Sequence, residues 1–215
     1  MKRFRFTLLA VCLVLAWLGY HDVTLFLRNQ EPLPVSIVEL EQSGAPREWL
    51  QIKDGFLDLE QAINPSGRIE TFENGPFFVP LLSRTGSDTI AVVVETRRPE
   101  VLETLKKYVL GFDSSEAQQN YLENNPDAFH PQLTITGMTA SWLTSTANRD
   151  KLLQLAKEQN MPVSADVIFV SEGKEPGKFR GFFFAIIALL GILKFIQMTI
   201  KKESGLAIDL PKDKD

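Results

Sequence analysis

Cysteine and histidine are nearly absent from this 215-residue sequence, which has one cysteine and two histidines. The single cysteine, Cys12, lies inside an apolar run near the N-terminus, so no disulfide can form within the chain. A zinc site needs three or four convergent ligands, mostly Cys and His. The two histidines, His21 and His130, are too few to supply them. The sequence therefore predicts no metal site.

The glycine patterns that bind nucleotide phosphates are also missing, because neither GxGxxG nor GxxxxGK[ST] occurs. His130 is the one histidine far from the apolar ends, and no nucleophile-elbow motif accompanies it to suggest a Ser-His-Asp triad. Carboxylates are plentiful in the first half of the chain: Asp54, Asp58, Glu60, Glu70 and Glu73. Beside turns they are expected on a solvated surface, although two facing carboxylates could hydrolyse a glycan. We predict no catalytic residue and no cofactor.

Positive charge is scarce in the middle of the chain. Residues 28–178 contain 14 lysines and arginines against 22 aspartates and glutamates, a net charge of −8. Nucleic-acid binding needs clustered basic residues, so this composition argues against it. It also argues against adhesion of this region to an anionic lipid surface. An acidic surface favours solubility.

Two long apolar runs stand near the chain ends. The first, within residues 1–27, follows three basic residues and has the outline of a signal peptide or signal anchor. No small-x-small cleavage site follows it, so we predict an uncleaved transmembrane anchor. Its apolar core is short for a bilayer, and Arg5 at one end with Trp17 and Tyr20 at the other can extend its reach to the headgroups.

The second run covers residues 179–200 and has the length of a bilayer-spanning helix. Lys201 and Lys202 follow it. Because basic flanks stay in the cytoplasm, we expect both termini inside, with residues 201–215 as a short cytoplasmic tail. Residues 28–178 would then form an extracytoplasmic domain, periplasmic if the membrane is a bacterial inner membrane.

Three polar residues in or beside the runs invite comparison with an intramembrane proton relay: His21, Asp22 and Lys194. The expected topology places His21 and Asp22 at the outer surface and Lys194 near the inner one, so they could not meet. We expect Lys194 to extend to the headgroups instead. The small residues Ala185, Ala188 and Gly191 suggest that the second helix packs on Ala16 and Gly19 of the first.

The region between the runs alternates short apolar stretches with turn residues. We expect strands at residues 35–40, 49–52 and 56–59, the last two forming a hairpin across Asp54-Gly55. Residues 77–82 and 89–96 are predicted to pair, with 89–96 central in the sheet. Two later strands are expected at 133–138 and 163–170.

Helices are predicted at residues 99–110, 113–124 and 145–159. Pro99 suits a first helical position, Gly111 a C-cap, and Ser114 stands in a capping stretch. The whole is an α+β domain with a mixed or antiparallel sheet that could close like a barrel, plus two or three helices. Four aromatic residues are expected in its core, with a ligand pocket or a partner groove as the alternative: Trp49, Phe77, Phe78 and Trp142.

These observations favour a membrane-anchored, non-enzymatic protein whose exported domain binds another membrane or envelope protein. A small-ligand or lipid-binding barrel is the main alternative. A carboxylate-dependent hydrolase is the second.

Overall fold

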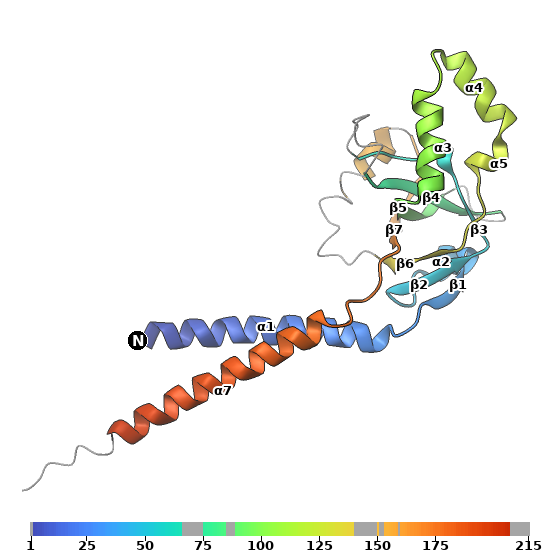
Figure 1. Ribbon diagram of the computed structural model, residues 1–215. Helices are drawn as coiled ribbons and strands as arrows, with labels where there is room; N and C mark the ends of the chain where they lie inside the picture. The colour runs from blue at the N-terminus through green and yellow to red at the C-terminus, as the bar shows by residue number, and fades with distance from the viewer. Residues whose placement is uncertain are drawn as a thin grey trace, which may run out of the picture. The chain divides into compact units, whose positions relative to one another are not determined.

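The computed structural model describes residues 2–65, 75–84, 89–139, 150, 153–158 and 160–206. Its contacts divide the chain into two compact units. One unit joins residues 1–30 with 176–215, and the other comprises residues 31–175. Figure 1 shows the first unit as two long helices and the second as a sheet with shorter helices.

The second unit is built on a seven-stranded mixed sheet. Its strands are β1 (Leu33–Ser36), β2 (Trp49–Lys53), β3 (Gly55–Leu57), β4 (Phe77–Ser83), β5 (Ile90–Thr96), β6 (Ile135–Thr139) and β7 (Val163–Glu172). They lie in the order β1-β2-β6-β7-β5-β4-β3. The pairs β1/β2 and β5/β7 are parallel, and the other pairs are antiparallel. The α+β class with a mixed sheet is therefore confirmed.

The sheet is open, with β1 and β3 at its edges. One isolated bridge, between Phe56 of β3 and Gln132, links the β3 edge to the segment before β6. The Leu57 amide also donates to the Pro131 carbonyl at 3.1 Å. The sheet thus curls toward itself, but the described strands form no continuous ladder that would make a closed barrel.

The hairpin predicted across Asp54-Gly55 is wrong. Strand β2 pairs with β6, and β3 pairs with β4, so the two neighbours in sequence do not pair with each other. A two-residue hairpin turn of type I′ needs positive φ at both central residues. Only Asp54 has it, with φ 63°, so the chain bends there and does not reverse.

The strand predicted at residues 35–40 is also partly wrong, because the strand ends at Ser36 and a helix follows. Helix α2 spans Ile37–Ser43, and the Ser36 hydroxyl accepts a hydrogen bond from the Glu39 amide at 3.2 Å. This Ser-x-x-Glu spacing is a capping-box signature. Gly44, with φ 75°, ends the helix. The capping signal outweighs the apolar alternation that suggested a strand.

Loss of the Ser36 cap gives a measurable destabilisation. We expect Ser36→Ala to lower the free energy of unfolding by about 0.5–2 kcal/mol, because the Glu39 amide loses its acceptor. Urea unfolding of the full chain in detergent measures the change. Ser36→Thr keeps a hydroxyl and is the matched control; equal losses in both variants would show that the cap is not the cause.

The predicted pairing of 77–82 with 89–96 is confirmed by the antiparallel pair β4/β5. Strand β5 lies between β7 and β4, as expected of a central strand. It is almost entirely buried. Branched apolar side chains on a strand covered on both faces explain this placement.

Two of the predicted helices form close to their expected bounds. Helix α3 spans Pro99–Leu110 with Pro99 in its first turn, and α4 spans Ser115–Asn124, capped by the Ser114 hydroxyl on the Ala117 amide. Two shorter helices are also present: the 3-10 helix η1 (Leu59–Gln61) and the α-helix α5 (Pro126–Phe129). Of the helix predicted at 145–159, residues 153–158 are helical, and the other described residue, Asp150, is also helical. The rest lies outside the described residues.

Two groups of buried apolar side chains form the core of this unit. The larger collects residues from the sheet, α2, α3 and α5, including Ile37, Leu50, Val94 and Phe129. The smaller lies under residues 153–158 and includes Phe78, Val93 and Val167. Burial of these side chains supplies the main stabilisation of the domain.

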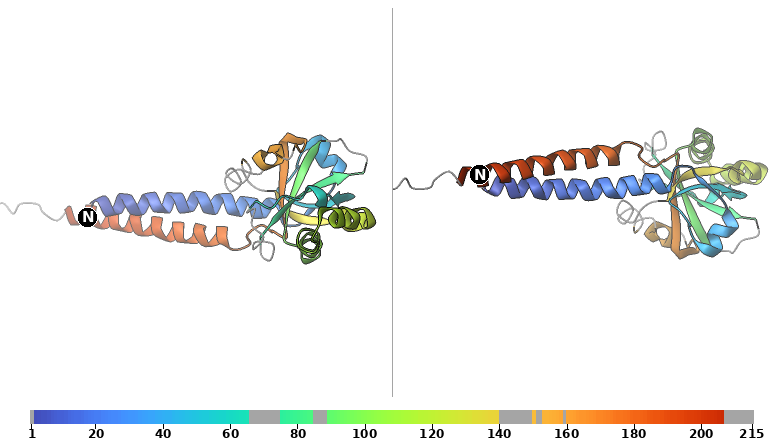
Figure 2. Two further views of the ribbon diagram at one scale, coloured as in Figure 1. Left: turned by 90° about the horizontal axis from the view of Figure 1, so that it is seen from above. Right: turned by 90° about the horizontal axis from the view of Figure 1, so that it is seen from below.

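The first unit consists of α1 (Lys2–Arg28) and α7 (Arg180–Leu206). Figure 2 shows the two helices side by side, with the N-terminus and the C-terminal end of α7 at the same end of the pair. Residues Phe6–Arg28 and Arg180–Ile200 have mean hydropathies of 1.8 and 2.2. Both are long and apolar enough to cross a membrane.

Candidate functional site

The contact between α1 and α7 depends on glycine. A Cβ atom added to Gly19 would lie 2.8 Å from the backbone nitrogen of Ala185. A Cβ atom on Gly181 would lie 2.7 Å from the backbone nitrogen of Val23. Since backbone atoms cannot move aside, only glycine permits this approach. The predicted contact of Gly19 with the small-residue stripe of the second helix is thus present.

The same stripe continues along α7. Ala188 is 2% exposed, and Gly191 lies against Cys12, which is itself 2% exposed. As positions on α1 decrease from Gly19 to Cys12, their partners on α7 increase from Ala185 to Gly191. The helices are therefore antiparallel, with a narrow seam of small side chains.

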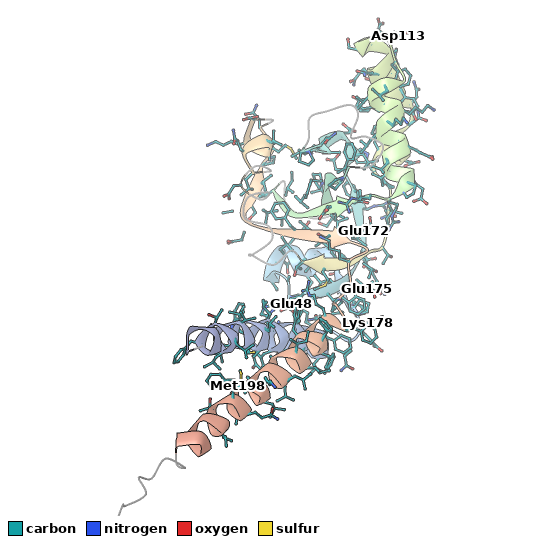
Figure 3. All side chains as sticks on the ribbon, turned by 60° about the vertical axis from the view of Figure 1, so that its left-hand side comes forward. Glu48, Asp113, Glu172, Glu175, Lys178 and Met198 are labelled. Atoms are coloured by element: carbon teal, nitrogen blue, oxygen red, sulfur yellow. The ribbon has the colours of Figure 1, made fainter. Side chains whose placement is uncertain are left out.

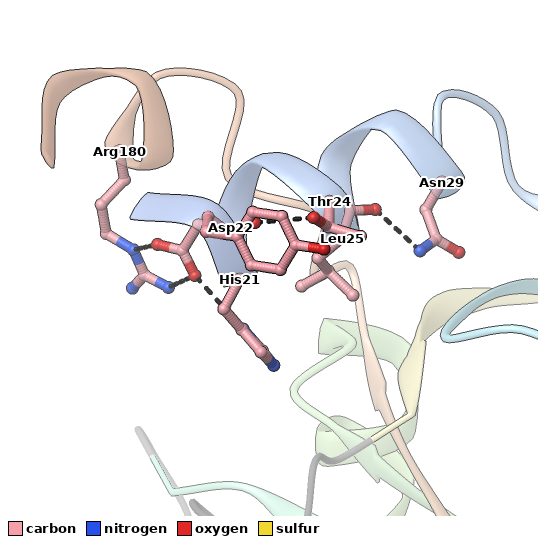
Figure 4. A network of polar contacts seen from close by, with 7 residues as sticks. His21, Asp22, Thr24, Leu25, Asn29 and Arg180 are labelled. Carbon is pink, nitrogen blue, oxygen red and sulfur yellow. Dashed lines mark hydrogen bonds and ion pairs between the residues drawn. The ribbon is translucent and has the colours of Figure 1, made fainter. Parts of the chain in front are cut away.

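A charged pair joins the helices at one end of the seam (Figure 4). The Asp22 carboxylate accepts from Arg180 Nε at 2.6 Å and from a terminal guanidinium nitrogen at 3.0 Å. His21 Nδ1 lies 3.9 Å from the same carboxylate. Because two guanidinium nitrogens bond to one carboxylate, this contact fixes the orientation of the two side chains as well as pairing opposite charges. Sequence analysis missed the pair, although an acid at one end of the first run and an arginine before the second were visible.

Polar groups near this end are satisfied within α1. The Thr24 hydroxyl donates to the Tyr20 carbonyl at 2.7 Å, and the Asn29 side-chain Nδ2 donates to the Leu25 carbonyl at 2.9 Å (Figure 4). Asn29 is 1% exposed. These bonds close the C-terminal turn of the helix, where carbonyls otherwise lack partners.

In the structure, Lys194 lies far from His21 and Asp22, as expected of residues that do not form a proton relay. Asp22 contacts Arg180, and Lys194 follows Arg180 by 14 residues along α7. At 1.5 Å per residue this is about 21 Å. Proton transfer between Lys194 and the Asp22 group cannot occur directly.

Away from the seam, both helices expose large apolar side chains. The exposed aromatic residues include Trp17 (60%), Tyr20 (73%), Phe179 (82%) and Phe183 (60%). They lie within two turns of the Asp22–Arg180 pair in sequence. Of these, tryptophan and tyrosine are the side chains that concentrate at membrane–water boundaries.

In the domain, His130 lies close to two of the carboxylates that sequence analysis assigned to a solvated surface. Its Nε2 atom lies 3.8 Å from Asp58 Oδ1 and 3.7 Å from Glu60 Oε1. Its Nδ1 atom is 3.1 Å from the Pro126 carbonyl oxygen, and its ring packs edge-on against Phe56. His130 is therefore held by contacts to three elements of the fold, β3, η1 and α5.

The described residues supply no nucleophile that would complete a catalytic triad with His130 and Asp58. Asp58 is 6% exposed and already accepts bonds from the Glu60 amide at 3.2 Å and from Gln61 Nε2 at 2.6 Å. No hydroxyl or thiol in the described part of the chain hydrogen-bonds to His130. Nor do the described residues contain a group of three or more His, Cys, Asp or Glu that could hold a metal ion. The cluster caps η1 and joins it to the end of α5.

A second polar group lies where the parallel strands β5 and β7 end. The Ser171 hydroxyl donates to Glu95 at 2.6 Å, and Lys174 Nζ donates to Ser171 at 3.2 Å. Lys174 also faces Glu95 at 3.7 Å. A serine beside a lysine can act as a nucleophile and base. Here Ser171 is 5% exposed and its proton is directed to Glu95, so the geometry fits an internal ion-pair network.

Glu172, labelled in Figure 3, forms a separate polar group at the end of β7. It accepts a hydrogen bond from the buried Thr96 hydroxyl and forms an ion pair with Arg98. These contacts fasten the ends of two neighbouring strands. They explain the polar residues there without a substrate.

The predicted aromatic core is partly observed. Phe77 is 2% exposed and Phe78 is 8% exposed, and they belong to the two apolar groups described above. Trp49 is half-buried on β2. Trp142, together with Glu70 and Glu73, lies outside the described residues.

Two hollows lie beside residues 153–163. The smaller one has a volume of about 20 Å³ and is lined by apolar side chains that include Phe78, Met161 and Phe169. The other has a volume of 370 Å³, is open to solvent, and is lined in part by Lys157 and Asn160. Small-molecule pockets usually have volumes of about 300–1,000 Å³ and bury most of the ligand surface. The first hollow is too small for this, and the second is too open.

The structure thus defines an α+β domain carried between two long apolar helices that pack together. Comparison with protein-family models, curated proteins and solved structures finds no match to this chain.

Proposed function

We propose that this chain is a membrane-anchored, non-enzymatic protein whose exported domain binds or scaffolds another membrane or envelope protein. The observation that carries the proposal is the antiparallel pair α1/α7. In its seam, Gly19 and Gly181 each lie against backbone atoms of the other helix. Its outer faces expose large apolar side chains. Such a pair suits a lipid environment, where small residues drive helix packing and apolar faces contact acyl chains.

The antiparallel arrangement brings the start of α1 and the end of α7 to the same end of the pair. Basic residues occur there on both helices, Lys2, Arg3 and Arg5 on α1 and Lys201 and Lys202 on α7. The positive-inside rule then favours both termini in the cytoplasm and residues 31–175 on the other side. In bacteria this would be the periplasmic side of the inner membrane.

A binding role is favoured over catalysis because the two polar groups described around His130 and Ser171 have internal partners. His130 is held by Pro126 and lies beside Asp58, and Ser171 donates to Glu95. The open hollow of 370 Å³ supports the alternative of small-ligand binding, but its exposure to solvent supports it only weakly. No described feature favours the carboxylate-dependent hydrolase.

Topology and proximity labelling test the proposal together. A reporter that is active only outside the cytoplasm, fused after residue 86, is expected to be active. The same reporter fused after residue 215 is expected to be silent. A labelling enzyme at the first position is then expected to mark a reproducible set of membrane or envelope proteins.

The matched control is the labelling enzyme carried by α1 alone, residues 1–30, which places it in the same compartment without the domain. Proteins that are marked equally by both fusions are bystanders. A silent reporter after residue 86, or an identical set of marked proteins in both fusions, would contradict the proposal.

A further inference from the structure

The side of α7 that faces away from α1 carries a lysine and a glutamine among apolar residues. Gly181 and Ala188 are buried in the seam. On the opposite side the exposed positions follow one another at spacings of four and three: Phe183, Ile187, Leu190, Lys194 and Gln197. Residues at this spacing form one continuous face of a helix. We call these five residues the outer face of α7.

Neither Lys194 nor Gln197 makes a hydrogen bond or ion pair with any described residue. The only acidic residues of α1 and α7 are Asp22 and Glu203. Asp22 is bound to Arg180, about 21 Å from Lys194 along the helix, and Glu203 is about 13 Å away in the other direction. Neither α1 nor α7 therefore has a carboxylate at the depth of Lys194.

A second copy of the chain cannot supply that carboxylate either. In the same membrane a second copy has the same orientation, so its Asp22 lies at the level of Arg180. Two Lys194 side chains at one depth would repel each other. An acidic group at this depth must come from a different protein.

Extension of Lys194 to the nearer headgroups is opposed by helix geometry. The Cα–Cβ bonds of a helix tilt toward its N-terminus. On α7 the N-terminus is at Arg180, so the Lys194 side chain starts toward the bilayer centre and away from the end at Ile200, which is about 9 Å distant.

We infer that the outer face of α7 docks a transmembrane helix of another protein, which carries an aspartate or glutamate at the depth of Lys194. The inference rests on the proposed function in that it takes α1 and α7 as membrane spans. A carboxylate would satisfy the Lys194 ammonium in a low-dielectric medium, and Gln197, one turn away, can donate to the same group. Phe183, Ile187 and Leu190 would pack against the apolar part of the docked helix.

Photo-crosslinking from within the membrane tests this surface. Leu190 is replaced by p-benzoylphenylalanine in the full chain, and native membranes are irradiated. Leu189, which is 58% exposed but points to the side of the helix, is the matched control position. We expect one defined protein adduct from position 190, absent or weak from 189, with a carboxylate in its crosslinked transmembrane segment.

The charge dependence of the adduct decides the proposal. Lys194→Met is expected to lower the adduct yield about tenfold, which corresponds to about 1.4 kcal/mol of association energy. Lys194→Arg keeps the charge and is expected to keep the adduct. Lys194→Asp, combined with exchange of the partner's acid for lysine, is expected to restore it.

Other results would overturn the inference: adducts with lipid only, adducts with a second copy, a partner segment without an acid, or a yield that Lys194→Met leaves unchanged. Lys194→Met makes the span more apolar, so loss of insertion cannot explain a lost adduct. If proximity labelling from the domain finds neighbours while position 190 gives no charge-dependent adduct, this inference fails and the proposed function stands.

Discussion

Gly191→Cys is expected to form a disulfide with Cys12 within the chain. A Cβ atom at position 191 lies 3.8 Å from the Cys12 Cβ atom, within the range of about 3.5–4.5 Å found in disulfides. Cys12 is the only cysteine of the chain, so no other intramolecular pair can compete. Mild oxidation of membranes that contain the variant should link most molecules if the seam between α1 and α7 is as described.

The link is read after chemical cleavage at methionine. Cleavage after Met138, Met161 and Met198 separates the fragment that holds Cys12 from the fragment 162–198 that holds position 191. The two fragments migrate together on a non-reducing gel only if the disulfide has formed. Reduction separates them.

Leu190→Cys is the control, because its side chain is 61% exposed and faces away from Cys12. We expect no link between the same two fragments in this variant. Equal linkage in both variants, or none in Gly191→Cys, would show that the helices do not pack in this register. A further substitution, Gly19→Leu, should abolish the Gly191→Cys link because its side chain would strike the Ala185 backbone.

Phe129→Ala is expected to have the largest effect on the stability of the domain. Phe129 is 0% exposed, and its ring packs edge-on against Tyr108 at 5.2 Å and against Tyr121 at 6.0 Å between ring centroids. Removal of the ring leaves a cavity between α3, α4 and α5. Such substitutions cost about 3–5 kcal/mol, a large fraction of the roughly 5–15 kcal/mol that keeps a domain folded.

Urea unfolding of the full chain in detergent, followed by tryptophan fluorescence, measures the loss. Phe112→Ala is the matched control, because Phe112 is half-buried and touches the same Tyr121 at 5.0 Å. Its expected loss is less than half as large. If both variants unfold at the same urea concentration, Phe129 is not the centre of this part of the core.

Much of the secondary structure could be predicted from local sequence signals. Pro99, Ser114 and Gly111 placed the ends of α3 and the start of α4 from sequence, because caps depend on residues a few positions apart. The branched apolar run of β5 indicated a central strand for a similar reason. The Ser36 cap was an equally local signal, but the apolar alternation beside it obscured the start of α2.

Contacts between segments that are distant in the sequence could not be predicted from such local signals. The Asp54-Gly55 pair predicted a hairpin, but β2 pairs with β6, which lies more than 80 residues later in the sequence. A strand's side-chain pattern shows which face is buried but not which strand lies beside it. The position of His130 beside Asp58 is a second case, because it follows from the packing of α5 near η1 and not from any motif.

The amino-acid sequence by itself determined that two long apolar helices flank an α+β domain in the chain, because hydropathy, length and caps are properties of contiguous residues. Only the tertiary structure decided the register of α1 against α7, the Asp22–Arg180 pair, and the side of α7 on which Lys194 lies. These depend on close approach of atoms from opposite ends of the chain. That approach is set by the glycine seam as a whole, so no short stretch of sequence encodes it.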